Sequence, residues 1–311
     1  MLDAHQLNVF IVAAETLNFT KTAKHLHMTQ PSVSQHIQSL ESGFGAKLFE
    51  RNGRHLELTD AGFALVSMAR DFVQMSIRIE ETMESLKGKI YGHLMVGCST
   101  TPGKYILPQL LTQFHHRHPH VKVTCQVTNQ RASIDMLCEG RVNFALTSTS
   151  RHLCSDAEFR HFICDPVALI APLDHPWAQK DFIEPDELYD ANFIMREEGS
   201  GTFSAVHEAL MQSEIDIHRL QVLLTLGNSE AIALSVQEGL GVGFVSSMVV
   251  DRLTHDKVAK VKVRGLEICR DIFIGRQTRL PASAAQIAFW EFVQGVDQPF
   301  AQAEELALDY S

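Results

Sequence analysis

The sequence predicts a multidomain fold, with an all-α winged helix-turn-helix first, a linker helix next, and an α/β body of two lobes last. A chain of 311 residues exceeds what one hydrophobic core usually supports. Apolar residues follow helical spacing up to about residue 89, whereas strand-like and helix-like segments alternate from residue 93 onward. We therefore expect domain boundaries near 1–58, 59–89 and 90–311.

The composition is that of an ordinary globular protein, with 45% apolar and 21% charged residues. The sequence has neither a long apolar run nor the basic and apolar start of a signal peptide, so we expect a cytoplasmic protein without a membrane partner. The net charge is −10, yet residues 18–55 carry a local charge of +3. A small basic surface on an acidic body has the sign expected for contact with DNA.

The first segment predicts three short helices. An apolar stripe at helical spacing indicates the first, and the second is expected from about Thr20 to His27. Thr29 is a plausible N-cap for the third helix, where Pro31 falls in the first turn and is therefore tolerated. The third helix is expected to bury Val33, Ile37, Leu40 and Phe44.

The opposite face of the third helix is polar and nearly uncharged. Glutamine and serine on such a face can bond base edges in the major groove, whereas the alternative is a solvated face on a small bundle. Gly43 and Gly45 are expected to end the helix, and residues 47–56 then predict two short strands around an Asn-Gly turn. Arg51 and Arg54 flank this turn, where they can meet a phosphate backbone or a minor groove.

Residues 13–62 resemble the DNA-binding domain of the LysR-type transcriptional regulators. The match includes Thr22-Ala23, the run Thr29–Ser34, and Leu48-Phe49-Glu50-Arg51. The resemblance implies that the residues reading bases are Gln30, Ser34 and Gln35. It also implies that the residues positioning the DNA backbone are Thr20, Ser32, His36, Lys47, Arg51 and Arg54.

Residues 59–89 predict a linker helix with a heptad seam, because apolar residues recur at spacings of three and four. Such a stripe packs on another helix, either in a second copy or on the body of the same chain. The resemblance implies a homodimer, and a homotetramer is a further expectation of the family. The dimerising residues would be Leu65, Met68, Phe72, Met75, Ile79 and Leu86.

From residue 93 the alternation of elements predicts a parallel α/β sheet. Strands are expected at 94–97, 121–127, 144–146 and 271–275, with helices at 106–118, 133–139 and 283–296. A second alternating set is expected at 167–171, 188–193, 202–213, 222–225, 230–238 and 242–246. These lobes resemble the periplasmic-binding-protein-like effector domain of the same family. Lobe I would hold about 90–163 and 267–311, and lobe II about 164–266.

Three polar segments follow predicted strands, where parallel α/β sheets bind ligands and helix N-termini favour anions. We therefore expect a small anionic effector between the lobes, although ordinary helix capping is the alternative and Glu197 and Glu198 weaken the argument for an anion. The stretch Thr100–Pro108 is similar to the branch with regulators of carbon-fixation and cysteine-biosynthesis operons. The candidate effector residues are Ser99, Thr100, Thr101, Thr147, Ser148, Thr149, Ser200, Gly201 and Thr202.

Three other functional interpretations of the sequence have weaker support. Six scattered cysteines without a CxxC pair are expected to be buried thiols, but Cys154 and Cys164 leave a redox-sensing regulator open as an alternative. A solute-binding protein would share the two-lobed body but would need export. The histidines of residues 115–120 are expected at a solvated helix end, not at a metal.

We expect no enzyme and no cofactor, because GxSxG, P-loop, HExxH and strand-linked GxGxxG motifs are missing. The sequence thus predicts a LysR-type regulator that binds operator DNA under the control of a small effector. Its expected partners are double-stranded DNA, the effector, further copies of itself and, as an additional candidate, RNA polymerase.

Overall fold

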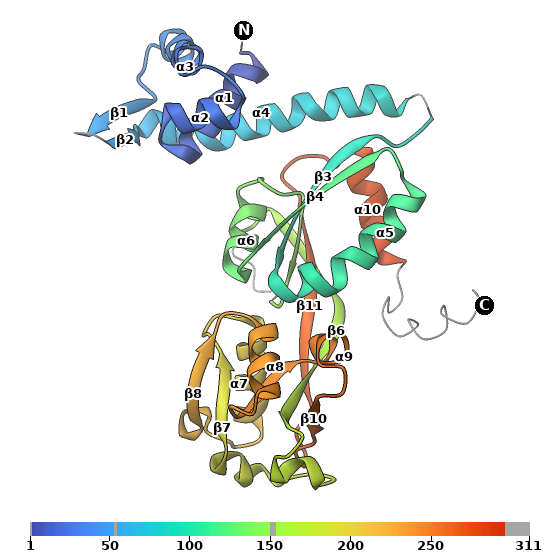
Figure 1. Cartoon of the computed structure of the whole chain (residues 1–311). Coiled ribbons are helices and arrows are strands. Elements are labelled where there is room, and N and C mark those ends of the chain that lie inside the picture. Colours follow the sequence, from blue (N-terminus) through green and yellow to red (C-terminus); the bar gives the residue numbers. More distant parts are fainter. Residues whose placement is uncertain (1, 53–54, 87, 150–153, 296–311) are drawn as a thin grey trace.

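The computed structural model describes residues 2–52, 55–86, 88–149 and 154–295 (Figure 1). A small helical unit lies at one end of a long helix, and two α/β lobes follow one another below it. The elements of the helical unit are α1 (Ala4–Thr16), α2 (Phe19–His25), α3 (Gln30–Phe44), β1 (Phe49–Asn52) and β2 (His55–Leu58).

Local capping sets the ends of these helices. The Asn18 side chain accepts from the amides of Thr20 and Lys21, so α2 begins one residue earlier than expected. The Thr29 hydroxyl accepts from the amide of Ser32, as the sequence predicts. Gly45, with φ of +67°, ends α3 in the left-handed conformation that glycine adopts readily.

The helical unit has its own core, in which the ring of Phe49 packs edge to face on Phe10 and Phe19 at 5.6 and 5.4 Å. These contacts fix the two-stranded wing against α1 and α2. The expectation that Phe44 is buried is wrong, because its side chain is 43% exposed. Phe44 is the last residue of α3, beyond Val33, Ile37 and Leu40, which are the residues of this helix that pack into the core.

The linker is α4 (Asp60–Ser85), which the hydroxyl of Thr59 caps. One face packs on α1 and includes Leu65 and the buried Ala69. The rest of the predicted seam is exposed, namely Met68, Phe72, Met75, Ile79 and Leu86. Within the described ranges, no helix is long and apolar enough to cross a membrane.

The body is built on one continuous mixed sheet. In lobe I, β3 (Gly92–Ser99) lies parallel between β4 (Val121–Thr128) and β5 (Phe144–Thr147). In lobe II, β7 (Asn192–Arg196) lies parallel between β8 (Gln221–Leu226) and β9 (Val242–Ser246). The parallel pairing predicted from the alternation of elements is thus present inside each lobe.

Two long strands cross from one lobe to the other, β6 (Ala157–Pro172) and β11 (Ile268–Gln277). They pair antiparallel with each other, β11 also pairs with β5, and β6 also pairs with β9 and β10 (Val258–Val261). The sheet as a whole is therefore mixed, with parallel pairing inside each lobe and antiparallel pairing at the crossover strands. Crossover strands pass between the lobes once in each direction, so they must run antiparallel.

Helices cover the sheet in both lobes. They are α5 (Leu107–Arg117), α6 (Gln130–Cys138), α7 (Gly201–Gln212), α8 (Ser229–Gln237), α9 (Ser247–Leu253) and α10 (Ala284–Gln294). A π-helical turn, Pro102–Ile106, precedes α5. The segment expected at 188–193 is instead a 3₁₀ turn (Pro185–Asp190) followed by β7, because the capping box of Glu184 with Glu187 starts a helical turn there. Further 3₁₀ turns are Pro176–Gln179 and Ile217–Arg219.

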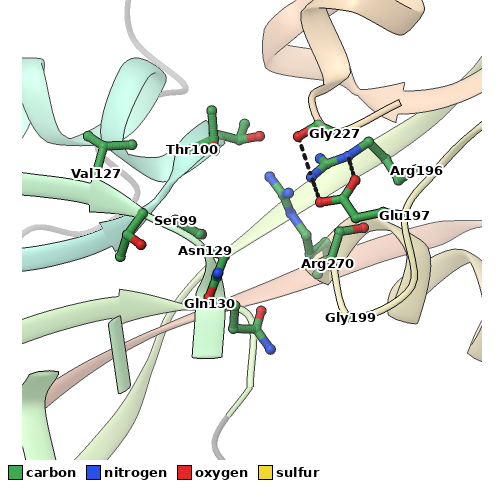
Figure 2. A pocket seen from close by; sticks show the side chains of 14 residues that line it. Ser99, Thr100, Val127, Asn129, Gln130, Arg196, Glu197, Gly199, Gly227 and Arg270 are labelled. Carbon is green, nitrogen blue, oxygen red and sulfur yellow. Dashed lines mark hydrogen bonds and ion pairs between the residues drawn. The ribbon is translucent and has the colours of Figure 1, made fainter. Parts of the chain in front are cut away.

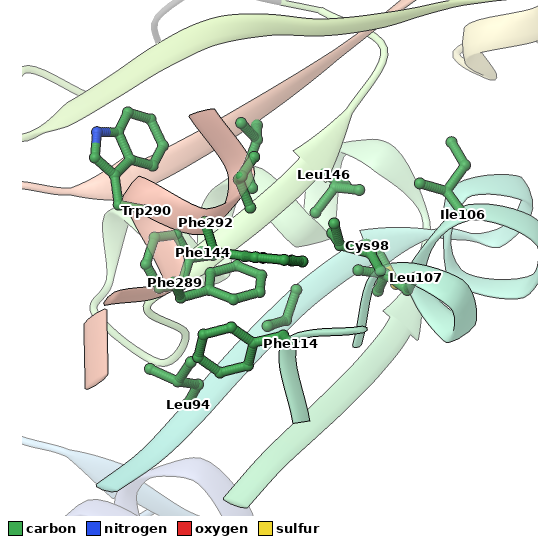
Figure 3. Packing of buried hydrophobic residues seen from close by; sticks show 14 of the residues in the cluster. Leu94, Cys98, Ile106, Leu107, Phe114, Phe144, Leu146, Phe289, Trp290 and Phe292 are labelled. Atoms are coloured by element: carbon green, nitrogen blue, oxygen red, sulfur yellow. The ribbon is translucent and has the colours of Figure 1, made fainter. Parts of the chain in front are cut away.

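Aromatic rings fill the core of lobe I (Figure 3). Phe289 on α10 packs edge to face on Phe114 of α5 at 5.0 Å and on Phe144 of β5 at 4.7 Å. The last described helix therefore returns to lobe I, as expected. Lobe II has separate cores, in one of which Phe193 and Phe244 stack at 5.7 Å.

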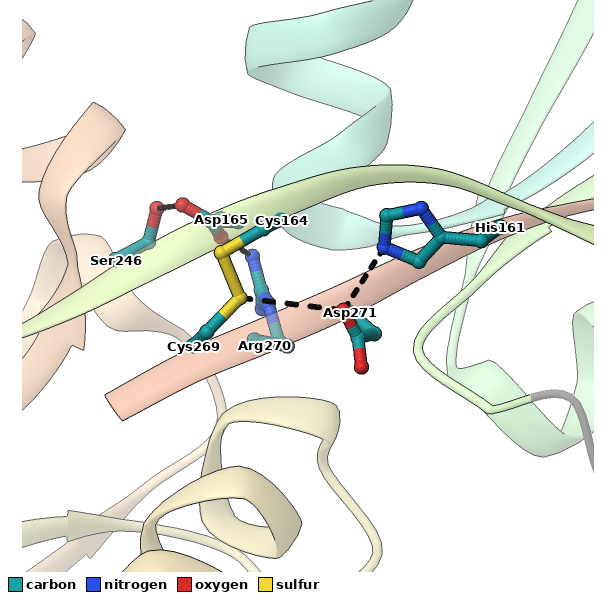
Figure 4. The surroundings of a disulfide bond; sticks show 7 residues. All are labelled: His161, Cys164, Asp165, Ser246, Cys269, Arg270 and Asp271. Atoms are coloured by element: carbon teal, nitrogen blue, oxygen red, sulfur yellow. Dashed lines mark hydrogen bonds and ion pairs between the residues drawn. A yellow bond between two sulfur atoms is a disulfide. The ribbon is translucent and has the colours of Figure 1, made fainter. Parts of the chain in front are cut away.

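Four of the six cysteines form disulfides, so the expectation of buried thiols is wrong for them. The pairs are Cys138–Cys154 and Cys164–Cys269, each with Cα atoms 5.7 Å apart. The suggested pair of Cys154 with Cys164 does not form. Antiparallel pairing of β6 and β11 brings Cys164 beside Cys269 across 105 residues of sequence, which local spacing does not reveal (Figure 4).

Cysteine titration tests these bonds. Cys98 and Cys125 are free, so the unfolded chain should show two reactive thiols without reductant and six after reduction. The measurement is a thiol-reagent count in denaturant on protein purified without reductant, with the fully reduced chain as the control. Six thiols in both samples would contradict the pairing.

Candidate functional site

The polar face of α3 is open to solvent at two of the three residues expected to read bases, and the third, Ser34, is half-buried. Gln30 and Gln35 are exposed, and the amide of Gln30 donates to the hydroxyl of Ser34 at 2.8 Å. Ser32 is half-buried. His36 is also half-buried, because its ring packs edge to face on His5 at 5.2 Å. The bond between Gln30 and Ser34 holds these two side chains in one orientation on the helix surface.

Three of the expected DNA-binding residues surround one surface hollow of about 390 Å³. Thr20 lies at the start of α2, Gln30 at the start of α3, and Arg51 on β1. Thr20 and Arg51 are exposed, so a cation and two polar groups face the same space. Lys47 is exposed as well, beside Glu41, and Arg54 lies outside the described residues.

Glu41 ties the recognition helix to the wing, and the sequence analysis did not single it out. Its carboxylate accepts from the amides of Leu48 and Phe49 at 2.9 and 3.4 Å and from the Lys47 ammonium at 2.7 Å. Burial raises the pKa of Glu41, but these hydrogen bonds and the charge of Lys47 lower it further, so the net pKa is below its usual value. The available signal was a glutamate one turn after Ile37, on the inward face of the helix.

A polar cavity of about 140 Å³ lies between the two lobes (Figure 2). The N-terminal ends of α6 and α7, capped by Asn129 and Ser200, border it from lobe I and lobe II. The free amides of helix N-termini favour a bound anion. The cavity is lined by Ser99, Thr100, Thr101, Val127, Thr128, Asn129, Gln130, Arg196, Glu197, Gly199, Ser200, Gly201, Gly227 and Arg270.

Arg270 reaches the cavity from the crossover strand β11 and is 3% exposed. It forms an ion pair with the buried Asp165 of β6 (Figure 4). Its Nη1 also donates to the hydroxyl of Thr202 at 2.9 Å. Its Nε has no hydrogen-bond partner among the described residues. Burial and the nearby charge of Arg196 lower the pKa of Arg270, and together they outweigh the opposite effect of Asp165.

Arg196 is the second arginine of the cavity and is 8% exposed. Its Nε and Nη2 each donate at 2.8 Å to one oxygen of the Glu197 carboxylate, in the two-pronged geometry of a strong arginine–carboxylate pair. Its other bonds go to the hydroxyl of Ser229 at 3.2 Å and the carbonyl of Gly227 at 3.3 Å. The strand end β7 and the start of α8 thus hold this guanidinium in place.

The structure brings five of the nine expected effector residues to the cavity, namely Ser99, Thr100, Thr101, Ser200 and Gly201. The other four, Thr147, Ser148, Thr149 and Thr202, are not among the lining residues. Thr147 is fully buried and donates to the carbonyl of Thr149, while Thr202 supports Arg270.

Ser148 lies behind the cavity lining, against Gly201. A Cβ atom at position 201 would lie 2.3 Å from the Ser148 hydroxyl, so glycine is required for the lobes to approach this closely.

Arg270 and the residues at the start of α6 were missed by the sequence analysis. Arg270 stands at an inward position of a strand whose neighbours Ile268, Ile272 and Ile274 are buried. A charged residue in such an alternating apolar pattern was a usable signal, because buried charges are rare without a specific role.

Replacing Glu41 by glutamine should loosen the wing. The folded pKa of Glu41 is lowered, so its stabilisation is present above the usual glutamate range and is lost as pH falls through the folded pKa. At pH 7 we expect a loss of about 1–3 kcal/mol, and this loss should shrink in acid. Amide hydrogen exchange of residues 41–52 measures it, with Glu50→Gln, at an exposed glutamate of β1, as the control. Equal exchange in both variants would contradict the assignment.

Comparisons with known proteins agree with this architecture. Residues 4–63 match the family model "Bacterial regulatory helix-turn-helix protein, lysR family", and residues 87–298 match "LysR substrate binding domain". The RuBisCO operon transcriptional regulator of Allochromatium vinosum is 33% identical over 93% of this chain and 94% of its own length. The HTH-type transcriptional activator CmpR of Synechocystis is 29% identical over 96% and 97%. These relatives confirm the resemblance to regulators of carbon fixation.

Solved structures share the fold. A full-length, singly substituted OxyR from Pseudomonas aeruginosa superposes with a TM-score of 0.72 at 22% identity and covers 96% of both chains. The regulatory domain of Synechocystis CcmR in complex with 2-PG gives a TM-score of 0.60 at 27% identity, covering 67% of this chain and 98% of that domain. With both domain models matched in order along its length, the chain belongs to the LysR family of transcriptional regulators.

Proposed function

We propose that this chain binds operator DNA through α3 and the wing, and that a small anionic effector in the cavity between the lobes controls this binding. The observation that carries the proposal is a polar cavity between the lobes, which two buried arginines, Arg196 and Arg270, line and the N-terminal ends of α6 and α7 border (Figure 2). Guanidinium groups and the free amides of helix N-termini both favour a bound anion.

The DNA-binding part rests on the face formed by Thr20, Gln30 and Arg51 and on the exposed Gln35. We assign base reading to Gln30, Ser34 and Gln35, because glutamine and serine can bond base edges in the major groove. Backbone contacts fall to Thr20, Ser32, His36, Lys47 and Arg51, with Arg54 as a further candidate. The relatives that cover nearly the whole chain are named as transcriptional regulators.

The effector part rests on the cavity and on one relative. The regulatory domain of CcmR is described in complex with 2-PG, and this chain matches 98% of that domain. We infer a ligand of similar size that carries an anionic group, held by hydroxyls of Ser99 and Thr100, by the N-terminal ends of α6 and α7, and by the two arginines. The remaining candidates Thr147, Ser148, Thr149 and Thr202 would support this set from behind.

We propose that two copies pair through the exposed side of α4, because Met68, Phe72, Met75, Ile79 and Leu86 would otherwise face water. Pairing places two recognition helices on half-sites of one operator. The same arrangement allows two dimers to assemble into a tetramer, and it allows a DNA-bound dimer to contact RNA polymerase.

One helix connects the cavity to the linker. α6 begins at Gln130 on the cavity and ends beside α4, where Gln74 donates to the carbonyl of Gly140 at 3.1 Å. Arg70 of α4 lies between Glu15 of α1 and Glu139 at the end of α6, at 3.0 and 3.5 Å. An effector that moves α6 would therefore move the linker, and would favour one DNA-bound conformation over another.

Two substitutions should separate base reading from backbone binding. Gln35→Ala should cost about 1–3 kcal/mol on the preferred operator and relax the sequence preference. Arg51→Ala should weaken binding on all sequences and reduce the slope of log K against log salt by about 1. Binding to operators selected from random DNA, at several salt concentrations, measures both effects. Arg131→Ala, on an exposed arginine of α6, is the control, and identical losses on all sequences for both variants would refute the assignment.

Titration with 2-PG and inorganic phosphate tests the effector site. Thr100→Ala should weaken binding several-fold, since a net hydrogen bond contributes about 0.5–1.5 kcal/mol. Thr278→Ala, an exposed threonine outside the cavity, should not. Saturating ligand should also change the DNA footprint, and an unchanged footprint with tight binding would contradict control by this cavity.

A further inference from the structure

Glu197 occupies the place where an anionic ligand of Arg196 would be expected. Two parallel hydrogen bonds of 2.8 Å join its carboxylate to the guanidinium. Arginine holds free carboxylate and phosphate groups with the same two-pronged geometry. Figure 2 shows this pair facing the cavity beside Arg270. A residue of the chain itself thus satisfies the arginine best placed to bind an effector.

The charges around the cavity balance without any ligand. Asp165 neutralises Arg270 and Glu197 neutralises Arg196. An anion that binds both arginines therefore has to replace one carboxylate or bear its repulsion. Asp165 is fully buried and also accepts from the Ser246 hydroxyl at 2.8 Å, so it is fixed. The side chain of Glu197 is 42% exposed, and its hydrogen bonds go to Arg196 and to its own amide.

We propose that Glu197 is an internal competitor of the effector. In the free protein its carboxylate occupies the two parallel N–H donors of the Arg196 guanidinium, Nε and Nη2, which we call the fork of Arg196. The anionic group of the effector displaces this carboxylate into solvent. This inference rests on the effector function proposed above, and it assigns Arg196 as the residue that anchors the anionic group. Displacing Glu197 lowers the apparent affinity of every ligand that uses the fork, so the residue sets the effector concentration at which the regulator responds.

The chemistry of the two residues supports a competitor that is charged in the cell. Partial burial raises the pKa of Glu197, but the hydrogen bonds from Arg196 and from its own amide, with the charge of Arg196, lower it further, so the net pKa is below the usual value. Arg196 keeps its bonds to Ser229 and Gly227 when Glu197 leaves. The fork would therefore remain in position for the incoming anion.

The test compares two neighbouring glutamates by calorimetric titration of the full chain with inorganic phosphate and with 2-PG. Glu197→Gln should tighten binding about tenfold, because a neutral amide competes weakly for the guanidinium. Glu198→Gln removes the same charge from the next residue, which is exposed and outside the cavity lining, and should change the affinity less than about twofold. Thermal unfolding of each variant verifies that it is folded.

A third variant tests the route of the effect. In an Arg196→Met background, Glu197→Gln should not tighten ligand binding further, because the guanidinium for which Glu197 and the ligand compete is gone. Equal affinities in Glu197→Gln and Glu198→Gln, whether both unchanged or both tightened, would overturn the competitor role while leaving an anionic effector in place. Absence of phosphate and 2-PG binding in every variant, Glu197→Gln included, would instead overturn the proposed effector function and this inference with it.

Discussion

The antiparallel pairing of β6 with β11 is the constraint on which the two-lobed body depends. This pairing brings Asp165 opposite Arg270 and places their ion pair in the interior between the lobes. A buried ion pair is costly to desolvate, and hydrogen bonds to its remaining groups offset part of that cost. Here the hydroxyls of Ser246 and Thr202, both from lobe II, bond Asp165 and the Nη1 of Arg270. The same pair therefore joins the strands, orients lobe II and presents an arginine to the cavity.

Two helices, α6 and α4, connect the cavity to the DNA-binding unit. α6 begins at the cavity and ends at α4, and α4 carries the helical unit through its packing on α1. At the far end, Glu41 fixes the wing to the recognition helix by hydrogen bonds to consecutive amides. Each step is a packed or hydrogen-bonded contact, so a displacement at the cavity has a physical route to the spacing of the recognition helices.

Local patterns predicted the local elements well. The N-cap at Thr29, the glycine that ends α3, and the apolar stripe of α4 all depend on residues within a few positions of one another. Strands and helices of the body were placed for the same reason. The exposure of Phe44 and the 3₁₀ turn at Pro185–Asp190 were not foreseen, because they depend on the space left by distant neighbours and on a capping box that had not been considered.

The sequence by itself determined which faces are apolar, where helices start, and that an α-helical unit precedes an α/β body, since periodicity records which side of each element avoids water. Tertiary structure alone decided that Cys164 meets Cys269, that Arg270 meets Asp165, and that Glu197 fills the fork of Arg196 beside the other lobe. The first two contacts join residues more than a hundred positions apart, and the third gains its meaning from the cavity. Contacts of this kind leave no periodic trace in the chain, because they follow from how two distant strands pair.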